Sequence, residues 1–221
     1  MLRHFTKELD ELNQKLLQMG AIVESSIHRA VRSLVEQNQG LAEEVLRDEP
    51  TINRMEMEID GMATRILALH QPVARDLRFL TAALKINTDL ERIGDLGAHI
   101  AKRALHVMHL PIVQQITDIP KMELLVGSML HKCLDAFVRG DADLARSILL
   151  ADDEVNMLRD AVYGELLETM RRDPSLVPAA IDLIFVARNL ERIGDHSTNF
   201  AEDVIFLVEG VDVRQHAKLS A

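Results

Sequence analysis

The chain carries the same six-residue segment twice. Leu-Glu-Arg-Ile-Gly-Asp occupies residues 90–95 and returns at residues 190–195 of a 221-residue sequence. An identical hexapeptide is improbable by chance at this length, so the sequence predicts two copies of one structural unit. On a helix, the glutamate and the aspartate of each copy stand four residues apart and share a face. Two like charges at this spacing cost roughly 0.2–0.5 kcal/mol unless a positive group lies against them.

The composition of the chain favours helices. Aromatic residues make up 3% of the sequence and Trp is absent, whereas Leu, Ala, Ile, Met, Glu and Arg are abundant. Most of these abundant residues are good helix formers, and the aromatic residues that favour strands are scarce. The composition therefore predicts an all-α fold.

Charge and cysteine content limit the classes of function. The formal net charge is −10, and such an acidic surface disfavours nucleic acid while remaining compatible with cations or a basic protein partner. Cys133 is the single cysteine, so no intrachain disulfide can form and a reducing compartment is the simpler expectation. Neither an apolar signal core nor a run of about 18 apolar residues is present. We therefore expect a soluble, cytoplasmic protein.

Apolar periodicity divides each copy into three helices. Apolar residues recur at steps of three and four, which lays one stripe along each helix. The predicted helices span residues 3–38, 41–70 and 73–107 in the first copy, and 120–139, 142–172 and 175–209 in the second.

Glycine and proline predict where these helices stop or bend. Gly40 is placed to end the first helix. Pro50 lies inside the second, which predicts a kink or a restart near residues 48–50. Residues 108–119 are expected to form a linker between the copies.

The repeat extends well beyond the hexapeptide. An offset of 103 residues aligns the first two helices of the copies, matching His28 with His131, and an offset of 100 aligns the third helices. We expect both histidines to be hydrogen-bonded packing residues. The alignment predicts two tandem three-helix bundles, over residues 1–109 and 118–221, related by a pseudo-twofold axis.

A column of polar residues extends each acidic pair along its helix. The apolar seam of the first copy lies on the opposite side, so we expect Glu91 and Asp95 to face solvent or another chain. Carboxylate, carboxamide and imidazole groups are ligands for ions such as Fe, Mn, Zn and Mg. The candidate metal ligands are Glu91, Asp95 and His99 in the first copy, and Glu191, Asp195, His196 and Asn199 in the second.

Local ion pairing is the alternative interpretation of this column. On exposed helix faces Lys85 can reach Asp89, and Arg188 can reach Glu191. Spacing alone leaves a metal site and a solvated polar face both open.

Three segments together resemble the PhoU family, which regulates bacterial phosphate uptake. They are the duplicated hexapeptide, residues 72–78 (Pro-Val-Ala-Arg-Asp-Leu-Arg) and residues 195–199 (Asp-His-Ser-Thr-Asn). The resemblance spans nearly the whole chain. It implies two three-helix bundles whose Glu-x-x-x-Asp pairs bind multinuclear iron or zinc clusters. Carried over residue by residue, that motif falls on Glu91, Asp95, Glu191 and Asp195.

The resemblance also implies a function. It implies a cytoplasmic, often dimeric, non-enzymatic protein that represses phosphate uptake and phosphate-starvation signalling. Its implied partners are the ATPase of the phosphate ABC transporter and a phosphate sensor histidine kinase. The two copies differ after the motif, because His196 and Asn199 of the second stand where the first has Leu96 and His99. We expect the second copy to hold metal more tightly and the first to lose it first.

Two other classes stay open. A di-iron carboxylate enzyme would need Glu-x-x-His motifs facing a bundle core, and none of the nine histidines has Glu or Asp three positions before it. A metal-free oligomeric scaffold would need only the solvated acidic face. No Gly-rich phosphate loop or hydrolase motif occurs, and nothing in the sequence indicates a phosphate pocket.

Overall fold

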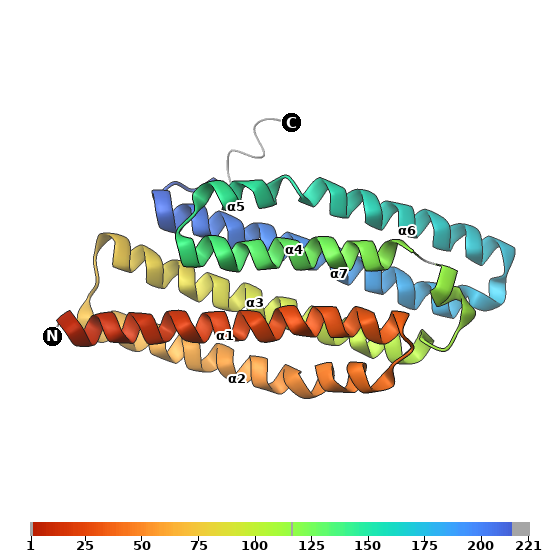
Figure 1. The fold of residues 1–221 in the computed structure, drawn as a ribbon, viewed down its shortest axis with the longest axis horizontal. Helices are drawn as coiled ribbons and strands as arrows, with labels where there is room; N and C mark the ends of the chain where they lie inside the picture. Colours follow the sequence, from red (N-terminus) through yellow and green to blue (C-terminus); the bar gives the residue numbers. More distant parts are fainter. Residues whose placement is uncertain (1, 116, 214–221) are drawn as a thin grey trace.

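A computed structural model describes residues 2–115 and 117–213 of the chain, and these residues form helices and no strand (Figure 1). The α-helices are α1 (Leu2–Val35), α2 (Gln39–His70), α3 (Ala74–Val107), α4 (Asp118–Arg139), α5 (Ala142–Leu149), α6 (Asp152–Arg172) and α7 (Val177–Glu209). Two short 3-10 helices connect them, η1 (Pro111–Gln115) and η2 (Pro174–Leu176). The predicted all-α fold is confirmed.

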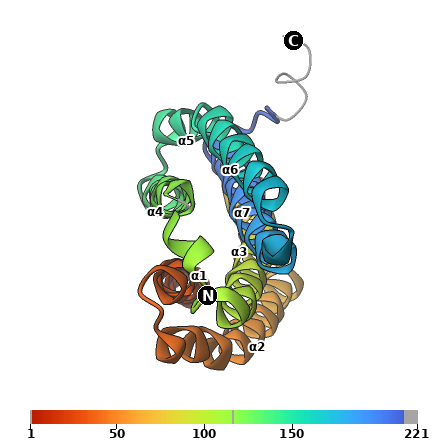
Figure 2. The ribbon, with the colours of Figure 1, turned by 90° about the vertical axis from the view of Figure 1, so that its right-hand side faces the viewer.

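The helices form two three-helix units that lie side by side. The first unit holds α1, α2 and α3; in the second, α5 and α6 together take the place of α2 between α4 and α7 (Figures 1 and 2). Between the units, α3 packs on α7 and α1 packs on α4. The contact between α3 and α7 is more extensive than any contact within either unit. The third helices are therefore the centre of the molecule.

The hexapeptides lie at the crossing of α3 and α7. Lys85 near the start of α3 contacts Asp203 near the end of α7, with 2.9 Å between Nζ and Oδ1. At the other end, Arg103 Nη1 donates to Asp182 Oδ1 at 2.6 Å. The two helices thus run antiparallel, and residues 90–95 and 190–195 both lie midway between these ion pairs.

One hydrophobic core runs through both units. Ile93 and Ile193, the isoleucines of the two hexapeptides, are fully buried. Cys133 of α4 is also buried, and its thiol donates to the Ser197 carbonyl oxygen of α7 at 3.1 Å. Buried side chains of all seven α-helices belong to the same cluster. The two predicted bundles therefore share a core.

One prediction about the second helices was wrong, and the restart expected near Pro50 does not occur. The predicted helix over residues 142–172 is divided into α5 and α6, whereas α2 continues through Pro50 without a restart. Pro50 is exposed, and buried Val45 and Ile52 on either side hold its helix against the core. In the second unit, three acidic residues in the first turn of α6 favour a new helix start because they complement the helix dipole.

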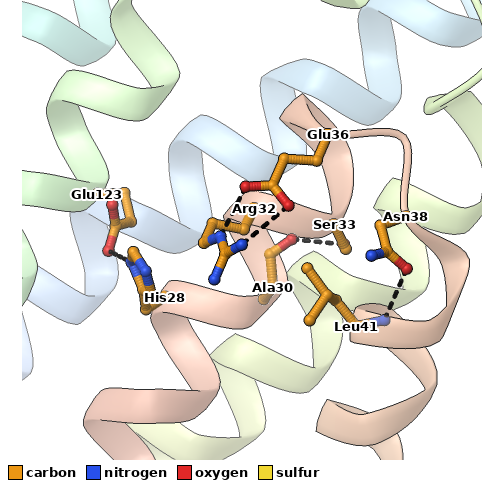
Figure 3. A network of polar contacts seen from close by, with 8 residues as sticks. All are labelled: His28, Ala30, Arg32, Ser33, Glu36, Asn38, Leu41 and Glu123. Carbon is orange, nitrogen blue, oxygen red and sulfur yellow. Dashed lines mark hydrogen bonds and ion pairs between the residues drawn. The ribbon is translucent and has the colours of Figure 1, made fainter.

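The end of α1 also differs from its prediction. Gly40 does not stop the helix; it lies within α2, and the positive-φ residue is Gln37, with φ 54°. Asn38 caps α2 by accepting a hydrogen bond from the Leu41 amide at 3.4 Å (Figure 3). The predicted linker contains η1, and α4 begins at Asp118.

The matched histidines join the units on the side of α1 and α4. His28 Nδ1 lies 3.1 Å from Glu123 Oε1, and His131 Nδ1 lies 3.1 Å from Glu24 Oε1 (Figure 3 draws the first pair). Both histidines are therefore hydrogen-bonded between α1 and α4, as expected, but their side chains are 52% and 64% exposed, so they are surface contacts and not buried packing residues. Among the described residues, no helix is both long and apolar enough to cross a membrane.

Candidate metal centres at the two acidic motifs

The glycine of each hexapeptide lets a second helix approach the acidic pair. A Cβ added at Gly94 would lie 3.0 Å from Ile52 Cδ1 of α2. A Cβ at Gly194 would lie 3.5 Å from Val155 Cγ1 and 3.7 Å from Asp152 Oδ1 of α6. The missing side chain therefore brings the second helix of each unit to the helix that carries the carboxylates.

The first acidic pair is half-buried rather than turned fully to solvent. The side chain of Glu91 is 17% exposed and that of Asp95 is 29% exposed. Arg92 contacts both, with 3.5 Å to Glu91 Oε2 and 3.9 Å to Asp95 Oδ2. Burial raises the pKa of Glu91, and the charges of Asp95 and Glu56 raise it further, against the opposing effects of Arg92 and His196. The surroundings of Glu91 and Asp95 therefore favour an additional positive charge.

The second acidic pair gains a third carboxylate from α6. Asp152 lies close enough to Asp195 and Glu191 for its negative charge to interact with theirs. Removal from water raises the pKa of Asp195 although its side chain is partly exposed, and the charges of Glu191 and Asp152 add to the rise. The pKa of Asp152 is likewise raised, first by burial, although a hydrogen bond from Asn156 at 3.0 Å opposes the rise.

An arginine occupies part of the second site. Arg159 Nη1 donates to Glu191 Oε1 at 2.7 Å and to Asn156 Oδ1 at 2.9 Å. The repeat alignment places Glu56 at the equivalent position of the first unit. The two sites therefore differ in charge, with a carboxylate in one and a guanidinium in the other.

The predicted nitrogen and amide ligands lie on the flanks of the acidic pairs. His196 Nδ1 is 2.8 Å from Asp89 Oδ1 of α3, so this histidine pairs across the two units. Asn199 lines one cavity between α3 and α7, and His99 lines another. Glu191, Asp195 and Asp152 thus lie close enough for their charges to interact, whereas His196, Asn199 and His99 lie along the seam between α3 and α7.

Asn87 lies one helical turn before Glu91 on α3, and its side chain joins two helices. It is buried, and its amide nitrogen donates to the Glu56 carbonyl oxygen and to Asp60 Oδ1, both at 2.9 Å. Asn87 therefore holds α2 against α3.

The ion pairs expected along single helices are replaced by pairs between helices. Lys85 binds Asp203 of α7 instead of Asp89, and Glu191 is paired with Arg159 of α6 instead of Arg188. The part played by Arg159 was missed, although the repeat alignment carries the signal, since it sets this arginine against Glu56. Helix spacing alone cannot reveal partners that arrive from a neighbouring helix.

The donor groups fit a metal ion, but they are not arranged around one. Within residues 2–115 and 117–213, no group of three or more His, Cys, Asp or Glu side chains is positioned to hold an ion. Two oxygens from the second helices are nevertheless buried without a hydrogen-bond partner, Asp152 Oδ1 and Asn53 Oδ1. Oxygens of this kind suit hard or borderline cations. Metal binding by the seven candidate ligands stays a prediction.

The fold and the duplicated motif define an all-α protein of two three-helix repeats with an acidic motif at their crossing. A family model described as the PhoU domain matches residues 16–104 and 119–204. A phosphate-specific transport system accessory protein PhoU homolog from Pseudomonas aeruginosa is 39% identical over 213 residues, covering 96% of this chain and 88% of that protein. A homolog from Caulobacter vibrioides is 37% identical, covering 96% of this chain and 93% of its own length.

Solved structures agree with these matches. The crystal structure of PhoU from Pseudomonas aeruginosa superposes with a TM-score of 0.86 at 38% identity, covering 94% of this chain and all (100%) of that one. That of the phosphate transport system regulatory protein PhoU from Streptococcus pneumoniae gives 0.88 at 30% identity, with coverages of 95% and 99%. The chain belongs to the PhoU family.

Proposed function

We propose that the chain is a negative regulator of phosphate uptake and of phosphate-starvation signalling. It acts in the cytoplasm as a homodimeric, metal-binding helical adaptor and not as an enzyme. Its partners are the ATPase of the phosphate ABC transporter and a phosphate sensor histidine kinase. One observation carries the proposal: the same acidic motif stands on both central helices, α3 and α7, of a chain from a family of phosphate transport accessory proteins.

Iron or zinc ions are the proposed cofactors. Glu91 and Asp95 would hold them in the first unit, and Glu191, Asp195 and Asp152 in the second. Bound cations would supply the positive charge that these carboxylates lack, and the raised pKa values of Glu91, Asp152 and Asp195 support a need for it. His196 would join as a ligand by turning from Asp89, and His99 and Asn199 by turning from the cavities that they line.

The two sites would differ in affinity because of Arg159. In the second unit its guanidinium is bound to Glu191 at 2.7 Å, so a metal ion must displace it or share that carboxylate. In the first unit Glu56 adds negative charge near Glu91. Arg92 also contacts the first acidic pair, but at 3.5 and 3.9 Å and with a side chain that is 57% exposed, so a metal ion displaces it more readily than Arg159, which is 23% exposed. This difference favours the first site, whereas His196 and Asn199 of the second copy had favoured the other. We infer that the first unit retains metal longer.

The same geometry weighs against a di-iron carboxylate enzyme. Enzymes of that class place their carboxylates in the core of a four-helix bundle. Here Glu91 and Asp95 keep side-chain exposures of 17% and 29% at the edge of a three-helix unit. The relatives, moreover, are named as accessory or regulatory proteins.

Elemental analysis of protein purified without an affinity tag tests the metal. We expect iron or zinc to be present and to return after chelation and reloading. E91A/D95A should lower the bound metal more than E191A/D195A, and Arg159→Glu should tighten the second site about tenfold. E165A/E168A removes two exposed carboxylates from α6 and should change nothing. If the reloaded wild-type protein takes up neither metal, the metal-free scaffold is the better description.

Pull-down with the transporter ATPase and with the sensor kinase tests the regulatory role. In phosphate-replete cells we expect both to associate with the chain, and we expect its deletion to derepress phosphate-starvation genes. No association under these conditions, together with no derepression on deletion, would count decisively against the proposal.

A further inference from the structure

A basic cavity lies between α3 and α7, at the end of the seam where α3 finishes and α7 starts. Its volume is about 580 Å³, within the range of about 300–1,000 Å³ that is typical of small-molecule sites. Four basic side chains line it: Lys102 and Arg103 of α3, and Arg188 and Arg192 of α7. His99 and His106 add two imidazoles. Such a concentration of positive charge stands out in a chain of net charge −10.

The pseudo-twofold axis relates this cavity to a second one with the opposite charge. The second cavity has a volume of about 390 Å³ and lies at the other end of the same seam. An offset of 100 residues maps Lys102 onto Glu202 and Arg103 onto Asp203, and both acidic residues line the second cavity. The same places in the fold therefore accept either charge, so packing does not require the basic lining.

Two of the four basic groups are held in place by neighbours. Arg103 donates to Asp182 at 2.6 Å and lies over the ring of Phe185, 4.6 Å from its centroid. Lys102 Nζ lies 3.4 Å from a Glu49 carboxylate oxygen. The wall of the cavity is thus partly preorganised, and only part of its positive charge is neutralised.

The other two arginines have no such partners. Among residues 2–115 and 117–213, neither Arg188 nor Arg192 makes a hydrogen bond or an ion pair. Arg192 is informative because its counterpart in the identical hexapeptide behaves differently. Arg92 contacts the carboxylates of its own motif at 3.5 and 3.9 Å, whereas Arg192 lines the cavity. Two guanidinium groups therefore reach one cavity without a hydrogen-bonded or ion-paired carboxylate, although Arg192 is close enough to Asp195 to lower the pKa of that carboxyl.

We propose that this basic cavity binds a phosphoryl oxyanion. Arg188 and Arg192 take its oxygens, and Arg103 is the fixed third guanidinium beside them. The planar fork of a guanidinium matches a phosphoryl group, to which it donates two parallel hydrogen bonds. The volume leaves room for more than one phosphoryl group, so the ligand is either free orthophosphate or the phosphoryl chain of a larger molecule.

Isothermal titration calorimetry on the full chain tests the proposal. The protein is first stripped of metal with a chelator, because a bound metal ion could itself take phosphate; failure here is thereby separated from failure of the metal sites. The probes are orthophosphate, tripolyphosphate and citrate at low salt. We expect wild-type protein to bind a phosphoryl probe, with an affinity that falls as salt is added.

Matched variants locate the binding. R188A/R192A should weaken it at least tenfold, and R192K, which keeps the charge but loses the fork, should weaken it less. R171A/R172A removes the same charge from the exposed end of α6 and should leave the affinity within twofold. The variants remove exposed side chains, and circular dichroism checks that each keeps its helices.

The probes identify the source of the ligand. Equal affinity for orthophosphate and tripolyphosphate indicates free phosphate, and at least tenfold tighter binding of tripolyphosphate indicates a larger phosphorylated molecule; both support the proposal. It is overturned if wild-type protein binds neither, if R188A/R192A binds as well as wild type, or if citrate binds equally well at the same arginines.

Discussion

Asp195 is a carboxylate whose environment opposes its ionisation. Its pKa is raised, first by removal from water and then by the charges of Glu191 and Asp152. The folded state therefore binds the Asp195 proton more tightly than the unfolded chain does. The resulting stability is fully present below the ordinary aspartate pKa of 3.8 and is lost as the pH rises through the folded-state pKa.

Neutralising Asp195 should consequently stabilise the metal-free protein near neutral pH. We expect Asp195→Asn to raise the free energy of unfolding at pH 7 by roughly 0.2–0.5 kcal/mol, the cost of a like-charge pair at this spacing. The gain should shrink as the pH falls from 7 toward 4. Urea denaturation across that range measures it.

Asp173 provides a control of opposite sign. Hydrogen bonds from Ser175 hold its pKa below the ordinary value, so Asp173→Asn should destabilise the protein at pH 7. A gain in stability from Asp195→Asn that did not change with pH would show that charge is not the cause.

Cys133 should be chemically silent in the native protein. It is buried, burial raises the pKa of its thiol, and the thiol donates to the Ser197 carbonyl oxygen. We expect a disulfide reagent such as DTNB to leave native protein unmodified for hours and to react with one thiol per chain within minutes in denaturing urea. Rapid modification in native buffer would contradict the burial of this residue.

At the scale of helices, the two hexapeptide glycines should respond differently to alanine. A Cβ at Gly94 would lie 3.0 and 3.1 Å from two carbons of Ile52, and only one of these ends a flexible chain. At Gly194 the nearest atom would be at an ordinary 3.5 Å. Alanine gains about 1 kcal/mol of helix propensity at either position, but overpacking costs about 1–3 kcal/mol.

Gly94→Ala should therefore lower the free energy of unfolding by about 1 kcal/mol, and Gly194→Ala should raise it by up to about 1 kcal/mol. Chemical denaturation of the two variants beside wild type compares them directly. Each glycine is the control for the other, because the flanking hexapeptide is identical. Equal destabilisation of both would mean that α6 approaches α7 as closely as α2 approaches α3.

The helices themselves could be predicted from periodicity, because one apolar stripe decides which face of a helix is buried. The positions where a helix breaks or continues could not be predicted in this way. Pro50 is tolerated because its neighbours on the apolar face, Val45 and Ile52, keep α2 on the core. The break between α5 and α6 carries neither proline nor glycine to announce it. Local breaker residues set a preference, and packing decided the outcome.

At the scale of the whole molecule, the shared core predicts one cooperative unfolding transition. Buried residues of both units form one cluster, and α3 contacts α7 more extensively than any helix in its own unit. We expect differential scanning calorimetry to give a single peak whose van't Hoff and calorimetric enthalpies agree.

Cavity-creating substitutions at equivalent buried positions of the two units provide the control for this prediction. Ile59 of α2 and Val162 of α6 match in the repeat, and both are fully buried. Ile59→Ala and Val162→Ala should each move the whole transition to lower temperature, by an amount that reflects a loss of about 1–5 kcal/mol. A split peak in either variant would show that the units unfold independently.

The sequence by itself determined the repeat, the helical class and the acidic pairs. These are local properties: helix propensity, the period of the apolar stripe and the four-residue spacing within one turn of a helix. The family could also be predicted from short motifs, and the matches to the PhoU domain and to PhoU homologs confirm it.

Only the tertiary structure decided what surrounds the duplicated motif. It set Arg159 on Glu191, paired His196 with Asp89, and left Arg192 at a basic cavity while its twin Arg92 stays with its own carboxylates. Each of these contacts depends on side chains from other helices, which single-helix spacing does not specify. Identical hexapeptides therefore acquire different electrostatic surroundings, because the residues packed around them differ between the two repeats.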